Sequence, residues 1–494
     1  MGKLVVSKLF LYKHRFVICY VLLALAFLTL MFGLPIVTPN GLSESEIESA
    51  VTAYNITDGT LASGDIVDLP YHLLQKLSIS IFGLTPYAIK LPSILIGVVL
   101  GFVLILLLNR WFKNNVAAFS SILAVLCSSF LFISGSGTPL IMFVFWPTLL
   151  LWLGSKIQGV NKPKPLYCFF FAFALLGAIF TPFMIYLALF IVILVIFNPH
   201  LRFTVKSLPK IPFLLTTMIV VAGCSFIIMN AIKHPTSLTH LLFMEDFSIL
   251  TYFQNIANSL TPFFSWNGRV ESTFLAPLIS LPTLALALIG LISTAKGFLA
   301  SRNSIATYLI IFTLLASGFN PDMAVLLTLP CAILIAHGLR YILNKWYGIF
   351  PENPYARVFG VVPIALFMGI MIYSDITHFF FGYRYNPPVS NQFSTDLALL
   401  DANLNGGDTL LVPEDSIDYE FYKIYAEINP LITSGRTVNI ATTAPDNIVA
   451  DSHLITMGHT EGIDMKKYDL FRIVTNSKSQ NSDRIYIYTL KTEK

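Results

Sequence analysis

Long apolar runs alternate with short polar segments over the first three quarters of the chain. An apolar helix of about 20 residues crosses about 30 Å of hydrocarbon. The run over 166–197 is too long for one untilted helix, and because Thr181-Pro182 near its middle favours a helix start, we divide it into a tight hairpin. The pattern predicts eleven spans, at residues 16–37, 88–108, 117–134, 138–154, 166–181, 182–197, 211–229, 273–294, 304–319, 322–342 and 358–375.

Composition supports a polytopic α-helical membrane protein. The chain is 55% hydrophobic and 12% charged, with a mean hydropathy of +0.72, which excludes an ordinary soluble globule. The first run, 16–37, is too long for the apolar core of a signal peptide, and no convincing cleavage site follows it. We therefore expect a retained signal anchor.

The distribution of Lys and Arg predicts the topology. Basic residues are concentrated in alternate inter-span segments, beginning with the N-terminal one, which the positive-inside rule places in the cytoplasm. A transmembrane domain over 1–376 would then carry long outer loops at 38–90 and 230–272. The opposite side holds only four basic residues in its loops, namely Lys76, Lys90, Lys233 and Arg269. The resulting location is a cell membrane, with the C-terminal tail outside.

The tail over 377–494 changes composition, because its apolar runs are only strand-length. It predicts a small soluble extracytoplasmic α/β domain. We expect helices at 394–404 and 418–428, a turn at 406–408, and strands at 409–412, 437–442, 453–457, 470–475 and 484–490.

Several classes of chemistry lack sequence support. All five cysteines fall inside predicted spans, so no disulfide framework is implied. The chain has no CxxC, HExxH, Walker, GxSxG or Rossmann glycine pattern. The basic residues line a membrane surface rather than a nucleic-acid groove, which argues against a nucleic-acid partner.

Acidic residues open the first outer loop. Ser43 and Glu46 have the spacing of a capping box, which predicts a helix start there. Glu44 and Glu48 share one face of that helix. These glutamates have two interpretations: a cap with a solvated face, or an acid or base facing a cavity at membrane level.

The same helix should have one apolar face. Ile47, Val51 and Tyr54 recur at helical spacing, so we expect the helix to lie along the membrane interface.

Motifs in and after this loop resemble the polyprenyl-phosphate-sugar-dependent glycosyltransferases of the GT-C fold. The resemblance covers the membrane part and includes the protein O-mannosyltransferase and lipid A aminoarabinose transferase branches. Its motifs are Ser45-Glu46 at the family's Asp-Glu pair, Leu69-Pro70-Tyr71-His72 at the proline segment, Phe82-Gly83, and Lys90-Leu91-Pro92-Ser93 at the basic-Leu-Pro-Ser segment.

The resemblance implies transfer of a sugar from a polyprenyl-phosphate donor to an acceptor hydroxyl of a glycan, lipid or protein. A carboxylate would take the hydroxyl proton, and cationic groups would stabilise the departing phosphate. The implied catalytic residues are Glu46 and Glu44, and the implied phosphate-binding residues are Lys90, Arg269, Lys76 and His72.

This sequence also departs from the family pattern. Ser45 replaces the usual aspartate, and the loop at 134–139 has no acid, so a metal bridged between the two loops has no support and the cofactor stays unassigned. A non-catalytic relative is therefore one alternative. A transporter of lipid-linked intermediates is another, although the spans carry almost no ionisable residues of the kind that ion-coupled transport requires.

Overall fold

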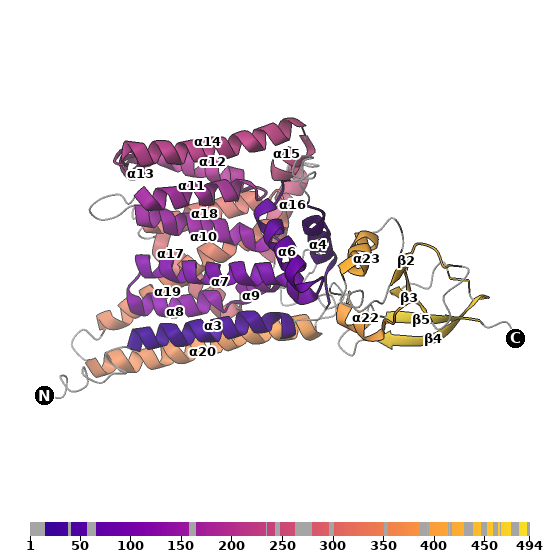
Figure 1. The fold of residues 1–494 in the computed structure, drawn as a ribbon. Helices are drawn as coiled ribbons and strands as arrows, with labels where there is room; N and C mark the ends of the chain where they lie inside the picture. The colour runs from indigo at the N-terminus through magenta and orange to yellow at the C-terminus, as the bar shows by residue number, and fades with distance from the viewer. Residues whose placement is uncertain are drawn as a thin grey trace.

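The computed structural model describes most of both predicted parts. Residue-level statements below concern residues 15–37, 41–56, 66–157, 165–233, 235–242, 248–261, 279–295, 301–349, 354–385, 393, 395–412, 414, 417–428, 438–445, 452–457, 463–464, 466–475 and 484–491. A bundle of helices forms one part and an α/β unit the other, and the two lie side by side (Figure 1).

The bundle contains helical counterparts of the predicted spans. They are α3 (Arg15–Val37), α7 (Pro86–Trp111), α8 (Asn114–Val125), α9 (Ser128–Gly135), α10 (Leu140–Ile157), α11 (Pro165–Ile179), α12 (Met184–Phe197), α14 (Lys210–Lys233), α17 (Leu281–Ala295), α18 (Ser301–Ser317), α19 (Thr328–Ile349) and α20 (Pro354–Tyr385). The predicted hairpin is confirmed, since α11 ends at Ile179 and α12 begins at Met184.

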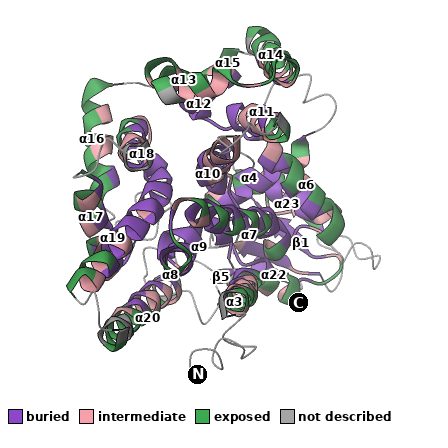
Figure 2. Cartoon of the chain, turned by 90° about the vertical axis from the view of Figure 1, so that its left-hand side faces the viewer, coloured by how far each residue is buried: buried purple, intermediate pink, exposed green. Residues whose placement is uncertain are grey.

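Length and hydropathy single out five of the described helices as long and apolar enough to cross a membrane, or six if the bent pair α8–α9 is one span. The number eleven therefore stays a prediction. The window Met323–Ile349, which contains α19, is 94% buried, whereas Lys210–Asn230 in α14 is only 11% buried. Thus α19 is almost wholly buried, whereas α14 lies at the periphery of the bundle with most of its residues exposed (Figure 2).

Shorter helices lie between these spans. The loop predicted over 38–90 contains α4 (Glu44–Asn55) and α6 (Leu69–Phe82), at the end of the bundle that faces the α/β unit (Figure 1). The remaining short elements are α13 (Pro199–Lys206), α15 (Pro235–Leu242), α16 (Ile249–Leu260) and the 3-10 helix η2 (Pro321–Leu327).

Two spans differ from their predicted form. The segment expected as one helix over 117–134 breaks between α8 and α9 and bends by 55°. The last span does not end at 375, because α20 continues to Tyr385. Asp375 explains both differences. It is 1% exposed and accepts hydrogen bonds from the Ser280 amide (2.8 Å), the Thr283 hydroxyl (2.9 Å) and the Ser128 backbone.

This aspartate therefore lies where α9 and α17 begin. The first amides of a helix have no partner within the helix, and a carboxylate satisfies them well. Hydropathy treats a charged residue as a span end, but an acid whose oxygens are satisfied by donors can lie within a helix.

Replacing Asp375 is expected to destabilise the bundle. Asp375→Leu leaves the Ser280 amide and Thr283 hydroxyl without their acceptor, at a cost of about 1–3 kcal/mol for each unsatisfied group. Asp375→Asn keeps one acceptor oxygen, so its loss should be smaller. Thermal unfolding of the detergent-solubilised variants checks this order. Equal midpoints for the leucine variant and wild type would contradict the assigned role.

The α/β unit contains α22 (Leu397–Asn403), α23 (Ile417–Ile428) and one sheet. The strands are β1 (Thr409–Leu411), β2 (Asn439–Ala441), β3 (Leu454–Met457), β4 (Tyr468–Thr475) and β5 (Arg484–Leu490), in the order β2-β1-β3-β5-β4. The pairs β1–β2 and β1–β3 are parallel, and β3–β5 and β4–β5 are antiparallel. Every predicted helix and strand of the tail thus has a counterpart.

Candidate functional site

Helix α4 begins with the predicted capping box. The Ser43 side chain accepts from the Glu46 amide at 3.3 Å, and the Ser43 amide donates to Oε2 of Glu46 at 3.1 Å. These two bonds satisfy amides that a helix start leaves open. They also fix the direction of the Glu46 side chain, which points away from the exposed side of α4.

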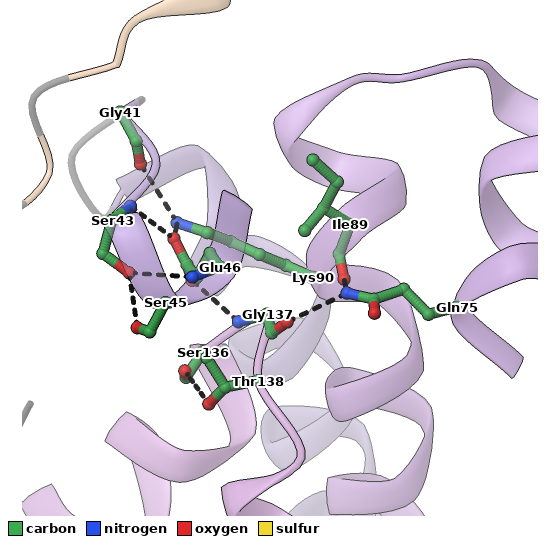
Figure 3. Close-up of polar contacts among 10 residues, drawn as sticks. All are labelled: Gly41, Ser43, Ser45, Glu46, Gln75, Ile89, Lys90, Ser136, Gly137 and Thr138. Atoms are coloured by element: carbon green, nitrogen blue, oxygen red, sulfur yellow. Dashed lines mark hydrogen bonds and ion pairs between the residues drawn. The ribbon is translucent and has the colours of Figure 1, made fainter. Parts of the chain in front are cut away.

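Glu46 is 1% exposed, the lowest value among the acids that the structure describes in the loop over 38–90. Its Oε1 accepts from the Gly137 amide at 2.7 Å, and its Oε2 lies 3.6 Å from Nζ of Lys90. Three chain segments therefore meet at one carboxylate: the start of α4, the start of α7, and the loop between α9 and α10 (Figure 3).

Lys90 is also buried, at 2% exposure. Besides Glu46, its ammonium has the Gly41 carbonyl oxygen at 3.4 Å and the Phe393 ring centroid at 5.4 Å. Both nitrogen–oxygen distances exceed the usual length of about 2.7–3.2 Å for a strong hydrogen bond. The ammonium is thus held by charge, with capacity left for a closer acceptor.

Gln75 of α6 completes the framework. It is fully buried, and its side-chain amide donates to the carbonyl oxygens of Ile89 at 3.2 Å and Gly137 at 2.9 Å. Its own oxygen accepts from the Ser49 hydroxyl at 2.8 Å. Gln75 therefore ties α6 to α7 and to the loop that contacts Glu46 (Figure 3), and through Ser49 it also ties these to α4.

The two flanking glutamates behave differently from Glu46. Glu44 and Glu48 are both exposed on α4. Ser45, at the position of the family's aspartate, is partly exposed, and its hydroxyl lies 3.1 Å from that of Ser43. At the start of α4, the carboxylate of Glu44, just before Ser45, is therefore exposed, and that of Glu46, just after Ser45, is buried.

The predicted phosphate-binding residues do not all share one place. Lys90 lies beside Glu46. Half-buried Lys76 donates to the carbonyl oxygen of Ile56, the C-terminal cap of α4. His72 is buried on α6, edge-to-face with Tyr71 at 5.7 Å. Arg269 lies outside the described residues.

The apolar face of α4 is covered by protein, which corrects the expectation of a membrane-interface helix. Ile47 and Val51 are buried in one cluster with Phe421 and Tyr425 of α23. The Tyr54 hydroxyl donates to Glu427 at 3.4 Å, and burial followed by the charge of Glu427 raises the pKa of Tyr54. Amphipathic spacing predicts a partner surface but cannot distinguish lipid from a distant helix.

A metal site is not evident among these groups. Within the described ranges, no three His, Cys, Asp or Glu side chains are grouped so that they could hold an ion. The buried carboxylate of Glu46 has the ammonium of Lys90 as its counter-charge.

Sequence reasoning named Glu46 and Lys90 but missed their surroundings. Gln75, Gly137 and Phe393 carry no motif, and their contacts join positions far apart in the chain. The one available signal was that Gln75 lies four residues from both Tyr71 and Ile79, which places a polar side chain beside large apolar ones on one face of the predicted helix.

Comparison with known proteins supports the fold assignment. The family model of dolichyl-phosphate-mannose-protein mannosyltransferases matches residues 70–228. No curated protein sequence matches the chain. ArnT from Cupriavidus metallidurans in the apo state is similar over 95% of this chain and 97% of its own, with a TM-score of 0.53 at 13% identity.

Two further solved structures are similar to this chain in fold. ArnT from the same organism bound to undecaprenyl phosphate gives a TM-score of 0.51 at 11% identity, over 96% of this chain and 98% of its own. The Archaeoglobus fulgidus oligosaccharyltransferase tethered with an acceptor peptide gives 0.51 at 13% identity, over 84% of this chain and 63% of its own.

The chain is therefore a membrane protein with the GT-C fold of membrane glycosyltransferases, as its motifs predicted. Within that fold, its family match lies in the segment from α6 to α14. It is a divergent representative, because the structural matches extend along nearly the whole chain at 11–13% identity.

Proposed function

We propose that this protein transfers a sugar from a polyprenyl-phosphate donor to an acceptor hydroxyl. The observation that carries the proposal is the similarity to ArnT along nearly the whole chain, including a structure bound to undecaprenyl phosphate. The family match of residues 70–228 to mannosyltransferases that use dolichyl phosphate mannose favours transfer over transport.

The residues at the start of α4 would take distinct roles. In a single displacement the acceptor oxygen bonds to the anomeric carbon, its proton passes to a carboxylate, and the bond to the phosphate oxygen breaks, releasing polyprenyl phosphate. Glu44 is the better base, because it is exposed next to the position of the family's aspartate. Both oxygens of Glu46 are occupied, so we assign Glu46 to positioning.

Lys90 is the proposed donor-phosphate ligand. Its ammonium can stabilise the charge that develops on the departing phosphate. Its present partners lie at 3.4 and 3.6 Å, so phosphate oxygens at shorter range can compete for it. Lys76, His72 and Arg269 are retained as candidate contributors to phosphate binding.

We also propose the topology. The N-terminus would be cytoplasmic, because Lys and Arg are concentrated on that side, and the site would face the outside of a plasma membrane. Residues 377–494 would form a separate extracytoplasmic domain. The placement of α4, α6 and the sheet at one end of the bundle supports this arrangement (Figure 1).

A glutamine scan of α4 tests the chemistry. Purified wild type, Glu44→Gln, Glu46→Gln and Glu48→Gln are reconstituted with a mixture of labelled polyprenyl-phosphate sugars. If Glu44 is the base, Glu44→Gln loses at least about 100-fold in transfer rate. Glu48→Gln, which changes another exposed glutamate four residues further along α4, is the matched control and keeps its rate. Unfolding midpoints identify losses that come from misfolding.

Other outcomes reassign the roles. If Glu46→Gln loses its rate while remaining as stable as wild type, Glu46 is the base. If wild type consumes no donor, the proposed transfer is wrong, and the second candidate, a non-catalytic relative, takes its place. The replacement of the family's aspartate by Ser45 favours that candidate.

A further inference from the structure

The Lys90 ammonium is enclosed by two parts of the chain that are distant in sequence. The transmembrane part contributes Glu46 and the Gly41 carbonyl oxygen. The segment that precedes α22 contributes Phe393, whose ring centroid lies 5.4 Å from Nζ. An aromatic face within about 6 Å attracts an ammonium through the ring quadrupole.

Contacts with residues 41 and 42 hold the backbone at Phe393 and Thr395 in place. Leu42 and Thr395 form an isolated antiparallel bridge, with amide-to-carbonyl distances of 2.8 and 3.3 Å in the two directions. Beside it, the chain passes so close to Gly41 that a Cβ there would lie 2.0 Å from the Phe393 carbonyl oxygen. Only glycine permits this approach, so the position of the ring depends on residue 41.

We propose that Phe393 is a positioning residue of the donor-phosphate site and holds the Lys90 ammonium through its ring face for a lipid-linked phosphate. The inference rests on the proposed function and extends it, because it makes the segment before α22 part of the site. The Lys90 ammonium has three N–H donors, and its two contacts with oxygen atoms are long. The ring of Phe393 can hold the ammonium in place without accepting a conventional hydrogen bond from it. The N–H groups therefore stay available to phosphate oxygens.

A purely structural role predicts different behaviour. Phe393 is 9% exposed and belongs to the apolar core of the bundle, so it also fills space. Leucine preserves much of that apolar packing but has no quadrupole, whereas tryptophan retains an aromatic face. If Phe393 only fills space, Phe393→Leu should behave much like wild type. If its ring holds the Lys90 ammonium, only Phe393→Trp should do so.

Two measurements on the full-length protein in detergent test the proposal. Binding of undecaprenyl phosphate is titrated by native mass spectrometry. Separately, acetylation of Lys90 by a water-soluble active ester is followed by peptide mapping, with exposed Lys423 as the internal reference. The second measurement needs no donor, so it reports on Phe393 even if no sugar is transferred.

We expect Phe393→Leu to weaken binding of undecaprenyl phosphate about 5- to 10-fold and to raise the Lys90-to-Lys423 acetylation ratio about fivefold, whereas Phe393→Trp stays within about twofold of wild type. Gly41→Ala should resemble Phe393→Leu. Its matched control is Gly369→Ala, where an added Cβ meets nothing within 4 Å.

The measurements distinguish failure of the role of Phe393 from failure of the proposed function. If wild type binds undecaprenyl phosphate and the leucine and tryptophan variants match it, Phe393 has no positioning role, although the proposed function stands. If wild type binds no undecaprenyl phosphate, the phosphate role and the proposed function fail together. An acetylation ratio that is unchanged in Phe393→Leu overturns confinement of the ammonium by the ring.

Discussion

Glu46→Ala is expected to destabilise the protein by about 3–5 kcal/mol, because it leaves the Lys90 ammonium buried without its counter-charge. Glu46 and Lys90 are 1% and 2% exposed, so solvent cannot replace the lost partner. The substitution also removes the acceptor of the Gly137 and Ser43 amides, which weakens the cap of α4 and its contact with the loop before α10.

A double-mutant cycle separates these contributions. Lys90→Met removes the charge and keeps most of the side-chain volume, so the pair Glu46→Ala with Lys90→Met should recover part of the loss. Denaturant or thermal unfolding of the four proteins measures the coupling. Additive losses in the double variant would contradict the assignment of a coupled buried pair.

The matched control lies on the same helix. Glu44→Ala removes an exposed carboxylate two residues away, and surface substitutions usually change stability by no more than about 0.5 kcal/mol. Stability thus distinguishes the two glutamates independently of any assay for sugar transfer. A large loss for Glu44→Ala would show that the exposed side of α4 also carries structure.

Local signals predicted much of the fold. The capping box of Ser43 and Glu46 depends on residues three apart, and it formed as expected. The tail strands followed from apolar alternation bounded by turn residues, and Arg484–Leu490 is a strand with its predicted bounds. In both cases the information lies within one segment, so no knowledge of distant partners is needed.

The missed features depend on distant partners. The break before Ser128 and the continuation of α20 past Asp375 both involve contacts between elements more than 90 residues apart. Likewise, the apolar face of α4 gave no indication that α23, more than 300 residues later, would cover it. Which of the three glutamates is buried also depended on Gly137 and Lys90, and spacing along α4 does not contain that information.

The second large effect is expected at the contact between α17 and α19. An added Cβ at Gly290 would lie 1.9 Å from the Leu334 carbonyl oxygen, and one at Gly338 would lie 2.2 Å from the Leu286 carbonyl oxygen. Small residues let two helix backbones approach closely, and here each glycine faces the backbone of the other helix. Because the obstacle is backbone rather than a flexible side chain, the helices themselves must separate.

Gly290→Ala and Gly338→Ala are therefore each expected to lower the free energy of unfolding by at least about 2 kcal/mol. The matched control is Gly348→Ala on α19, where an added Cβ meets nothing within 4 Å. That change should leave the free energy of unfolding within about 0.5 kcal/mol of wild type, because Gly348 is the second-last residue of α19 and its added methyl group has open space. Thermal unfolding in detergent compares the same substitution at a crowded and at an open position, and a Gly290→Ala midpoint equal to that of Gly348→Ala would rule out the close backbone contact.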